Sequence, residues 1–477
     1  MGLKFVNRKD ELALLRKRYE REGFEFFVIY GRRRIGKTEL IKNFLSEKPH
    51  IYHLCDKSGT ERNVSRLKRK IAEYLDEPPV ETNDLEEIFS HLVRRLDGKK
   101  MVMVFDEFSY LVEKDSTVPS LFQVVVDEVL RSTNTFLILC GSSISMMEKG
   151  VLSYKSPLYG RKTAHIKLAP IPFSSFHDFF PSNSIGKNVE FNSALGGVPF
   201  HLEKFSDEKS TMDNIKDQIL DKSGPLYEEI DFMLKEELRE PDVYKAVLSA
   251  IASGNTKVVH IANRSGIKAQ DMDKYLKVLI RLGIVKKEIP VTEVKSKKTV
   301  YSIDDNFFSL CFLFSEPFKS DLEIGEKNAA REKLKSDFSA FVGKKFEKLI
   351  REEILQKTGV IQAQKVGRWW GHYRDRETNE RKEVEIDIVA LNDNEILFGE
   401  CKWRDNVNGE RLLKRLKEKA KYVEWPCKRK MESREEFYLL LAKSFRRKIS
   451  EKNVYYLDLG DIEKLLRPEG KTQPSIE

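Results

Sequence analysis

The sequence predicts an α/β chain of several domains that begins with a parallel sheet. Three early runs are wholly apolar, at 26–30, 101–105 and 136–140. Continuous apolar runs are typical of strands covered on both faces, as in parallel sheets. Two later segments, 385–390 and 396–403, alternate between apolar and polar residues and predict strands of a second sheet. The chain has 477 residues, whereas a domain commonly has about 150.

The composition indicates folded domains in a reducing compartment. Hydrophobic residues make up 40% of the chain and charged residues 34%, with a formal net charge of +9. The five cysteines are scattered without a C-x-x-C pair, which argues against a disulfide framework and a structural zinc site. No apolar run approaches the roughly 18 residues of a membrane span, and the start lacks the apolar run of a signal peptide. We therefore expect a cytoplasmic protein without a membrane partner.

A glycine-rich turn follows the first apolar run directly. It consists of Gly31, Arg32, Arg33, Arg34, Ile35, Gly36, Lys37 and Thr38. A helical pattern begins at once after it, so backbone N–H groups at the helix N-terminus can surround an anion. In a phosphate-binding loop of this type, Lys37 reaches the β and γ phosphates and Thr38 ligates Mg²⁺. The expected ligands are therefore ATP and Mg²⁺.

Polar side chains end the second and third apolar runs. Asp106 and Glu107 lie where the strand emerges at the carboxyl edge, at which open α/β sheets bind ligands. We expect Asp106 to hold magnesium through water and Glu107 to polarise the water that attacks the γ-phosphate. Ser142 and Ser143 end the third run, which places hydroxyls beside the phosphates if that strand neighbours the glycine-rich turn. Alternatively, these serines cap the next helix.

Six segments occur in a distinctive order along the first part of the chain. They are FVNR at 5–8, GRRRIGKT at 31–38, VFDEF at 104–108, CGSS at 140–143, SPLYGR at 156–161 and GGVP at 196–199. In this order they resemble the archaeal ATPase family within the AAA+/STAND group of P-loop NTPases. The resemblance implies that Arg161 acts as an arginine finger on the γ-phosphate, in its own or a neighbouring subunit, and that Pro199 contacts the adenine. The alternative for Arg161 is a surface arginine after a turn glycine.

The middle of the chain predicts a winged helix-turn-helix. One helix starts at Asp242, and a second apolar-periodic helix runs through Met272 to Leu282. Two short strands follow, at 284–288 and 298–302, with lysines between them. The lysine-rich wing could bind DNA phosphates. In AAA+ and STAND proteins, however, this fold is as often a lever between domains.

Four side chains in the last part of the chain predict metal-dependent chemistry. Glu347 lies near the apolar face of a helix, Asp387 lies on one strand, and Glu400 and Lys402 share a face of the next strand. Such carboxylates can gather around Mg²⁺ while the ammonium group stabilises or helps to deprotonate an attacking water.

This D…E-x-K pattern with an upstream helical glutamate resembles the PD-(D/E)xK nuclease superfamily, in particular archaeal Holliday-junction resolvases. Ile386 stands where the superfamily motif has proline. The resemblance implies that Glu347, Asp387 and Glu400 are metal ligands or their supports and that Lys402 is the catalytic ammonium. A structural copy of the fold that no longer cleaves is the alternative.

Basic and aromatic residues flank this pattern. They are Arg368, Trp369, Trp370, His372, Tyr373, Arg374 and Arg376 before it, and Arg404, Arg411, Lys414, Arg415, Lys417, Lys419 and Lys421 after it. Interleaved cations and rings can grip a nucleic-acid strand, and a basic helix favours phosphate contacts. The tryptophans can instead pack the domain against its neighbours.

The expected organisation has six parts. They are an AAA+/STAND-type ATPase core at 1–180, a helical lid at 181–237, a winged helix-turn-helix at 238–306, a helical linker at 307–334, a nuclease-like domain at 335–465 and a flexible tail at 466–477. Such a chain could use ATP binding and hydrolysis to control cleavage of DNA. It could equally be an ATP-gated switch or scaffold that binds DNA or a protein without cutting. A homo-oligomer is compatible with either interpretation.

Overall fold

The computed structural model describes residues 5–374, 379–425 and 434–467. The chain forms two compact units. The first unit comprises Met1–Ile171, Val198–Phe200 and Lys235–Arg239, and the second comprises Pro172–Gly197, His201–Leu234 and Glu240–Glu477. Among the described helices, none combines the length and the apolar character needed to cross a bilayer.

The first unit is built on a five-stranded sheet whose strand order is β2-β3-β4-β1-β5. Every neighbouring pair is parallel. The strands are β1 (Glu25–Tyr30), β2 (His50–Leu54), β3 (Met101–Asp106), β4 (Thr135–Gly141) and β5 (Ala164–Lys167). The three predicted strands are therefore confirmed as the three central strands, and their carboxyl ends lie along one edge of the sheet.

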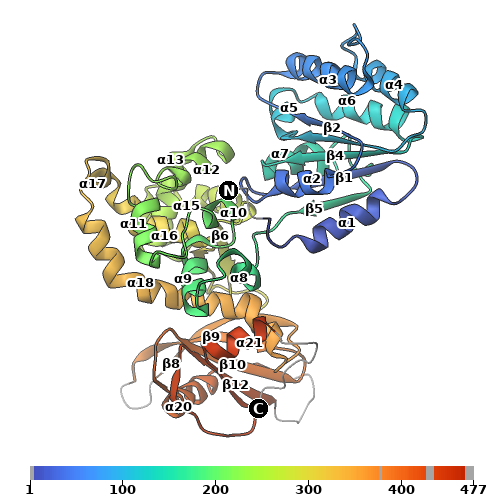
Figure 1. Ribbon diagram of the computed structural model, residues 1–477. Helices are drawn as coiled ribbons and strands as arrows, with labels where there is room; N and C mark the ends of the chain where they lie inside the picture. Colours follow the sequence, from blue (N-terminus) through green and yellow to red (C-terminus); the bar gives the residue numbers. More distant parts are fainter. Residues whose placement is uncertain (1–4, 375–378, 426–433, 468–477) are drawn as a thin grey trace. The chain divides into compact units, whose positions relative to one another are not determined.

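Helices cover both faces of this sheet (Figure 1). Along β1, Phe26 and Val28 pack into one core, whereas Phe27 and Ile29 pack into the other. The second core is closed by α1 (Lys9–Tyr19) and α2 (Lys37–Leu45). The first core is closed by α3 (Thr60–Leu75), α4 (Leu85–Leu96), α5 (Ser109–Lys114), α6 (Val118–Val124), a π-helix (Val125–Leu130), α7 (Ile144–Met147) and a second π-helix (Glu148–Leu152).

The second unit begins with helices and a hairpin. They are a 3₁₀ turn (Phe173–Ser175), α8 (Phe176–Phe179), α9 (Ile185–Leu195), α11 (Thr211–Gln218), α13 (Pro241–Ala252), α14 (Val258–Ser265), α15 (Ala269–Arg281), β6 (Val285–Glu288), β7 (Val300–Ile303), α16 (Asn306–Phe314), a 3₁₀ turn (Glu316–Phe318) and α17 (Lys319–Glu323). Strands β6 and β7 pair in an antiparallel ribbon. Helices α10 (Pro199–Leu202) and α12 (Glu229–Glu237) each contain residues of both units.

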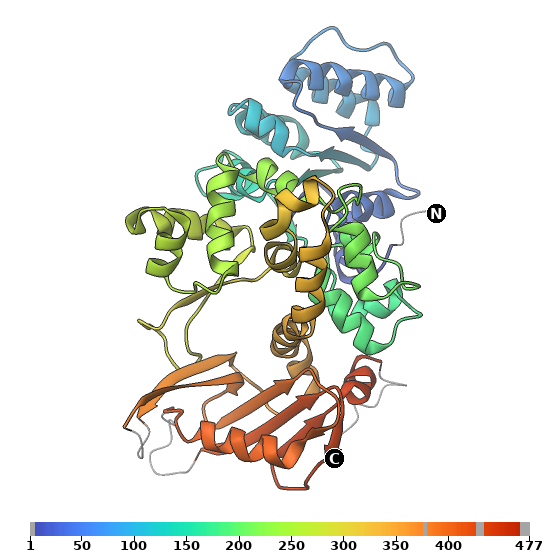
Figure 2. The same cartoon turned by 90° about the vertical axis from the view of Figure 1, so that its left-hand side faces the viewer.

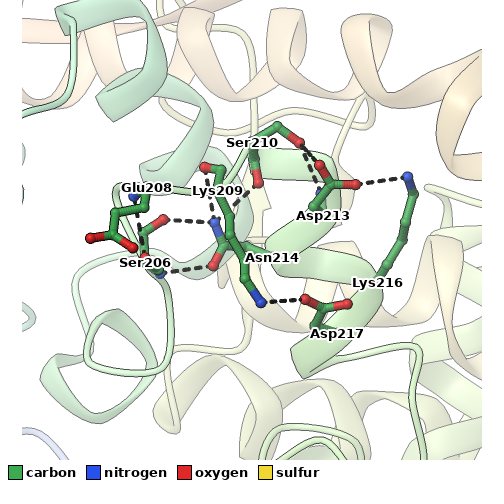
Figure 3. A network of polar contacts seen from close by, with 8 residues as sticks. All are labelled: Ser206, Glu208, Lys209, Ser210, Asp213, Asn214, Lys216 and Asp217. Carbon is green, nitrogen blue, oxygen red and sulfur yellow. Dashed lines mark hydrogen bonds and ion pairs between the residues drawn. The ribbon is translucent and has the colours of Figure 1, made fainter.

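A local polar network fixes the loop that leads into α11 (Figure 3). The Ser210 side chain accepts a hydrogen bond from the Asp213 backbone N–H and thereby caps the helix. The Asn214 amide donates to backbone carbonyls of the loop, including that of Lys209 at 3.3 Å. The Lys209 ammonium pairs with Asp217 at 2.7 Å. Because each contact is local, the network is explained by helix capping and loop closure.

A mixed five-stranded sheet forms the last part of the second unit, with the order β14-β12-β10-β9-β8. The β8-β9 and β9-β10 pairs are antiparallel, and the β10-β12 and β12-β14 pairs are parallel. The strands are β8 (Lys365–Arg374), β9 (Arg381–Leu391), β10 (Glu395–Lys402), β12 (Glu435–Ala442) and β14 (Val454–Leu457). A short pair, β11 (Val407–Asn408) and β13 (Phe445–Arg447), lies apart from this sheet, and α21 (Leu459–Leu466) follows β14.

Two helices pack against this sheet. Helix α20 (Gly409–Ala420) buries Leu412, Leu413 and Leu416 against it, and Figure 2 shows this helix lying along the strands. Helix α18 (Asn328–Leu349) brings Phe346 against Trp403, with ring centroids 5.1 Å apart. The predicted boundary at 334 falls inside α18, which continues through a π-helix (Ile350–Ile354) into α19 (Leu355–Thr358).

Candidate functional sites

The glycine-rich turn joins β1 to α2 at the carboxyl edge of the first sheet. Gly31 has a φ of 154°, and a Cβ there would lie 2.8 Å from the carbonyl oxygen of Leu168. Gly36 has a φ of 90°, in the left-handed region that favours glycine. The buried Lys37 ammonium donates to the carbonyls of Gly31 at 3.0 Å and Arg32 at 2.9 Å. The lysine therefore lies across the loop that the sequence assigned to phosphate binding.

Asp106 and Thr38 meet directly beside this loop. The Thr38 hydroxyl donates to the Asp106 carboxylate at 2.8 Å, and the Tyr52 hydroxyl donates to the same oxygen at 2.5 Å. Burial and the neighbouring Asp106 raise the pKa of Tyr52, so Tyr52 stays protonated as a donor. A hydroxyl and a carboxylate at one point are oxygen ligands that suit a hard cation such as Mg²⁺. Tyr52 lies on β2, and no sequence motif marked it as a residue of this site.

Glu107 is held by the serine at the end of β4. Its carboxylate accepts hydrogen bonds from the Ser142 backbone N–H at 3.2 Å and from the Ser142 hydroxyl at 2.5 Å. Strand β4 lies between β1 and β3, as the placement of Ser142 near the phosphates required. Ser143 caps α7 by accepting from Met146 N–H. Ser143 therefore caps the helix, as the alternative interpretation of the serines had it, and Ser142 orients Glu107. The place of Ser142 beside the phosphates stays a prediction.

Within the described residues, the Arg161 side chain contacts Asp127 and Pro157 and not the glycine-rich turn. Its Nε lies 2.9 Å from both carboxylate oxygens of Asp127, and Nη2 lies 2.6 Å from one of them. Its Nη1 donates to the carbonyl of Pro157 at 2.6 Å. This arrangement holds the Asp127 pKa below its usual range, chiefly through the hydrogen bond from Arg161. A finger role would therefore require Arg161 to leave Asp127.

Side chains from outside the first sheet also lie at the glycine-rich turn. Pro199 Cγ would lie 3.8 Å from a Cβ at Gly36, and the Arg34 guanidinium lies 3.8 Å from the centre of the Phe200 ring. The buried Arg8 donates to the carbonyl of Ile35 at 3.1 Å. In the sequence, Arg8 stands out only as the last residue of the FVNR segment. Its hydrogen bond to the loop depends on tertiary packing, which a sequence pattern does not predict.

The last sheet brings Asp387, Glu400 and Lys402 together. The Lys402 ammonium lies 2.8 Å from Glu400 and 3.9 Å from Asp387. The Asp387 carboxylate also accepts from the Cys401 N–H at 3.1 Å, and its backbone carbonyl accepts from Arg351 at 2.8 Å. A period-2 pattern on adjacent strands therefore correctly placed the two acids and the lysine at one point.

Glu347 is electrostatically close to the same group. Burial, followed by the charge of Asp387, raises the Glu347 pKa well above its ordinary value. Burial and the charge of Glu400 raise the pKa of Asp387. Carboxyl groups that disfavour one another's ionisation in this way are frequent at sites that bind cations or move protons.

A second lysine, which the sequence analysis assigned only to a basic helix, enters the site. Lys419 of α20 donates to both oxygens of Glu400, at 2.9 and 2.7 Å. Glu400 is thus paired with two ammonium groups. Within residues 5–374, 379–425 and 434–467, no three His, Cys, Asp or Glu side chains are grouped closely enough to hold a metal ion. The carboxylate oxygens suit Mg²⁺ chemically, but Lys402 and Lys419 already occupy the oxygens of Glu400.

The segment between β6 and β7 lies against the edge strand β8. The Val291 N–H donates to the carbonyl of Arg368 at 3.0 Å, and the Trp370 indole donates to the carbonyl of Lys298 at 3.1 Å. Arg368 also pairs with Glu288 at 3.5 Å and with Glu385. Two backbone groups of this wing, the Val291 N–H and the Lys298 carbonyl, are therefore bound to the edge strand, and DNA binding by the wing stays a prediction. Trp370 packs against this segment, as the alternative interpretation of the tryptophans had it. Arg376 lies outside the described residues.

Replacing Arg368 by alanine is expected to destabilise the last sheet by about 1–3 kcal/mol, because Glu288 and Glu385 lose their partner. All four tryptophans lie between residues 369 and 425, so tryptophan fluorescence during urea unfolding reports on this region. Lys365→Ala, an exposed change on the same strand, should shift the free energy of unfolding by less than about 0.5 kcal/mol. Equal shifts in the two variants would contradict the assigned role of Arg368.

Comparisons with known proteins place the chain in a family. Residues 5–205 match an ATPase domain predominantly from Archaea. Residues 311–419 match a family described as "Archaea bacterial proteins of unknown function". An uncharacterized protein of Methanocaldococcus jannaschii is 36% identical over 455 residues, which span 93% of this chain and 97% of that relative. The chain belongs to this family of archaeal ATPase-domain proteins.

Other similarities are shorter or more remote. An uncharacterized ATP-binding protein of the same organism is 50% identical over 44 residues, or 9% of this chain and 75% of the relative. The Walker-type ATPase of Pyrococcus abyssi has a TM-score of 0.48 at 20% identity, covering 65% of this chain and 96% of its own. The Aeropyrum pernix ORC2 protein, in ADPNP-ADP complexes, has a TM-score of 0.44 at 14% identity, covering 70% and 96%. The predicted relation to archaeal P-loop ATPases is thus confirmed by the family match.

Proposed function

We propose that this archaeal ATPase hydrolyses ATP and uses its nucleotide state to control a C-terminal, Mg²⁺-dependent nuclease acting on DNA. The observation that carries the proposal is the presence of two separate polar sites in one chain. One consists of the glycine-rich turn with Asp106 and Glu107, and the other of Asp387, Glu400 and Lys402. The six-part division of the chain from the sequence is part of this proposal.

In the ATPase site, each side chain has a separate task. Lys37 turns from the carbonyls of its own loop to the β and γ phosphates. Thr38 and Asp106 would hold magnesium, which neutralises phosphate charge when bound. Glu107, oriented by Ser142, accepts a proton from the attacking water or orients it. Pro199 packs on the adenine, and Arg161 senses the γ-phosphate after leaving Asp127.

Glu107→Gln is expected to preserve ATP binding and to lower the hydrolysis rate by about 100-fold or more. The amide keeps the shape of the side chain and can still contact Ser142, but it cannot accept a proton from water. Phosphate release and binding of a fluorescent ATP analogue would be measured on the same preparation. Glu113→Gln, an exposed change in α5, is the matched control. Turnover at the wild-type rate in the Glu107 variant would rule out the assigned role.

The order of elements in the last domain supports the nuclease-like assignment. Helix α18 precedes three antiparallel strands, β8 to β10, and helix α20 then leads to β12 in parallel with β10. Glu347, Asp387 and Glu400 would hold magnesium, which activates water and neutralises charge on a scissile phosphate when bound. Lys402 stabilises that charge from the protein side, and Lys419 must release Glu400 for the metal to enter.

DNA is the proposed partner of this domain. Arg411, Lys414 and Arg415 are exposed along α20, which also carries Lys419 into the site. Exposed cations beside a hydrolytic site would hold the phosphate backbone. We assign the helices and hairpin at 241–303 to a winged helix-turn-helix that acts mainly as a lever, because its wing is bound to β8.

A second candidate function has one specific observation in its favour. Glu400 is neutralised by both Lys402 and Lys419, and the described carboxylates do not group into a three-ligand metal site. Such an arrangement suits a domain that binds DNA or a protein partner without cutting, under the control of ATP. The cleavage experiments in the Discussion separate this scaffold from the nuclease.

A further inference from the structure

A short charged segment far along the sequence belongs to the ATPase unit. Lys235–Arg239 is part of the first unit, although the preceding residues of α12 belong to the second. The segment carries two consecutive acids, Glu236 and Glu237. Both reach side chains of the glycine-rich turn or of its immediate surroundings, although their sequence separation from that turn is about 200 residues.

Glu236 makes ionic contact with the turn itself. One carboxylate oxygen lies 2.8 Å from Arg33 Nη1 and accepts from the Tyr110 hydroxyl at 3.4 Å, and the other lies 3.5 Å from Lys57. Burial alone would lower the pKa of Arg33, but Tyr110, Glu236 and Glu107 together raise it. The Arg33 guanidinium is therefore within electrostatic reach of both Glu236 and the acid proposed to act on the γ-phosphate.

Glu237 contacts Ser143 and lies near Arg32 and Lys37 of the glycine-rich turn. Its carboxylate accepts a hydrogen bond from the Ser143 hydroxyl at 3.4 Å, next to the serine that holds Glu107. Burial raises the pKa of Glu237 to about 7, while the charges of Arg32 and Lys37 oppose that rise. The Glu237 carboxylate is thus close enough to Arg32 and Lys37 to be stabilised by their positive charges.

We propose that Glu236 and Glu237 determine nucleotide specificity, by placing negative charge where a γ-phosphate would bind and so disfavouring the triphosphate relative to the diphosphate. This inference rests on the proposed ATP site. A carboxylate and a phosphate within a few ångströms repel each other strongly in a partly buried site. They also compete for the same donors, because Arg33 and Ser143 are already engaged by the acids.

The consequence for the triphosphate differs from that for the diphosphate. ADP requires only the part of the turn that surrounds the β-phosphate, so both acids can keep their contacts. ATP also places a γ-phosphate against these two carboxylates, so it must displace Lys235–Arg239 from Arg33 and Ser143. Because this segment includes the end of α12, binding of the γ-phosphate would move that end of the helix.

The test compares the affinities of the full chain for ADP and for a non-hydrolysable ATP analogue, each with Mg²⁺, by titration calorimetry. At about pH 8, above the pKa of about 7 of Glu237, this carboxyl is mostly ionised. Under that condition we expect Glu236→Gln/Glu237→Gln to tighten analogue binding by about tenfold or more, because two like charges are removed. ADP binding should change by less than about threefold, because the β-phosphate lies farther from the acids. Glu240→Gln, an exposed acid three residues on, should leave the analogue-to-ADP ratio as in the wild type.

Two results would overturn the inference while leaving the ATP site intact. One is an analogue-to-ADP ratio that changes by less than about threefold in the double variant. The other is weaker analogue binding, which would mean that the acids orient Arg33 for the γ-phosphate. If the wild type bound neither nucleotide, both the ATP site and the inference would fail. A thermal melt of each variant shows that it is folded, and Glu236→Gln alone serves if the double variant does not fold.

Discussion

Replacing Lys37 by alanine should weaken ATP binding by about 100-fold or more, because one charge-assisted bond to phosphate is lost from a buried position. The ammonium lies across the turn, where it is bound to the carbonyls of Gly31 and Arg32. Binding of a fluorescent ATP analogue, followed by anisotropy, measures the effect directly.

The control for this variant lies one turn farther along the same helix. Lys42 is on α2, its side chain is 60% exposed, and it pairs with Glu39 at the surface. Lys42→Ala changes the net charge equally and should leave the affinity within about twofold. Equal loss of affinity in both variants would show that the Lys37 effect is one of general charge, and undiminished binding in Lys37→Ala would refute the site.

Asp387→Asn and Lys402→Ala are each expected to lower DNA cleavage by about 1,000-fold. Asparagine keeps the acceptor for the Cys401 N–H but loses the charge that a magnesium ion requires. Alanine at 402 removes the ammonium that lies beside both acids. Cleavage of branched, single-stranded and duplex DNA would be followed on gels with Mg²⁺, and again after chelation with EDTA.

Lys452→Ala provides the matched control, because Lys452 is an exposed lysine of the same domain and lies outside the basic segments expected to contact DNA. It should cut at the wild-type rate. If Asp387→Asn and Lys402→Ala cut as well as this control, the observed activity comes from elsewhere. If the wild type cuts none of the substrates and yet binds them, the scaffold function is the correct one.

The central strands of the first sheet were predictable, whereas its edges were not. Strands β1, β3 and β4 are buried on both faces, so apart from their end residues their sequences are apolar. Strands β2 and β5 lie at the two edges and are partly exposed. Short edge strands with mixed residues carry little pattern. Tyr52 was missed for this reason, since nothing marked its strand.

The carboxyl ends of the strands explain why much of both sites could be placed. Asp106 follows an apolar run, and Asp387 and Glu400 lie on strands whose residues alternate between apolar and polar. Their positions therefore follow from strand geometry. Lys419 instead reaches Glu400 from a helix whose charges look like an ordinary solvated face. Glu236 reaches Arg33 across about 200 residues of sequence. Contacts of this kind depend on chain folding over long distances, which local periodicity does not encode.

The central claim is that nucleotide binding at Lys37 controls the site at Asp387. The most direct measurement is the rate of DNA cleavage by the full chain with Mg²⁺ and either ATP, ADP or no nucleotide, in the wild type and in Lys37→Ala. The account predicts that ATP changes the wild-type rate by about tenfold, a coupling of ordinary size, and that Lys37→Ala does not respond. A wild-type rate that is the same under all three conditions would contradict it.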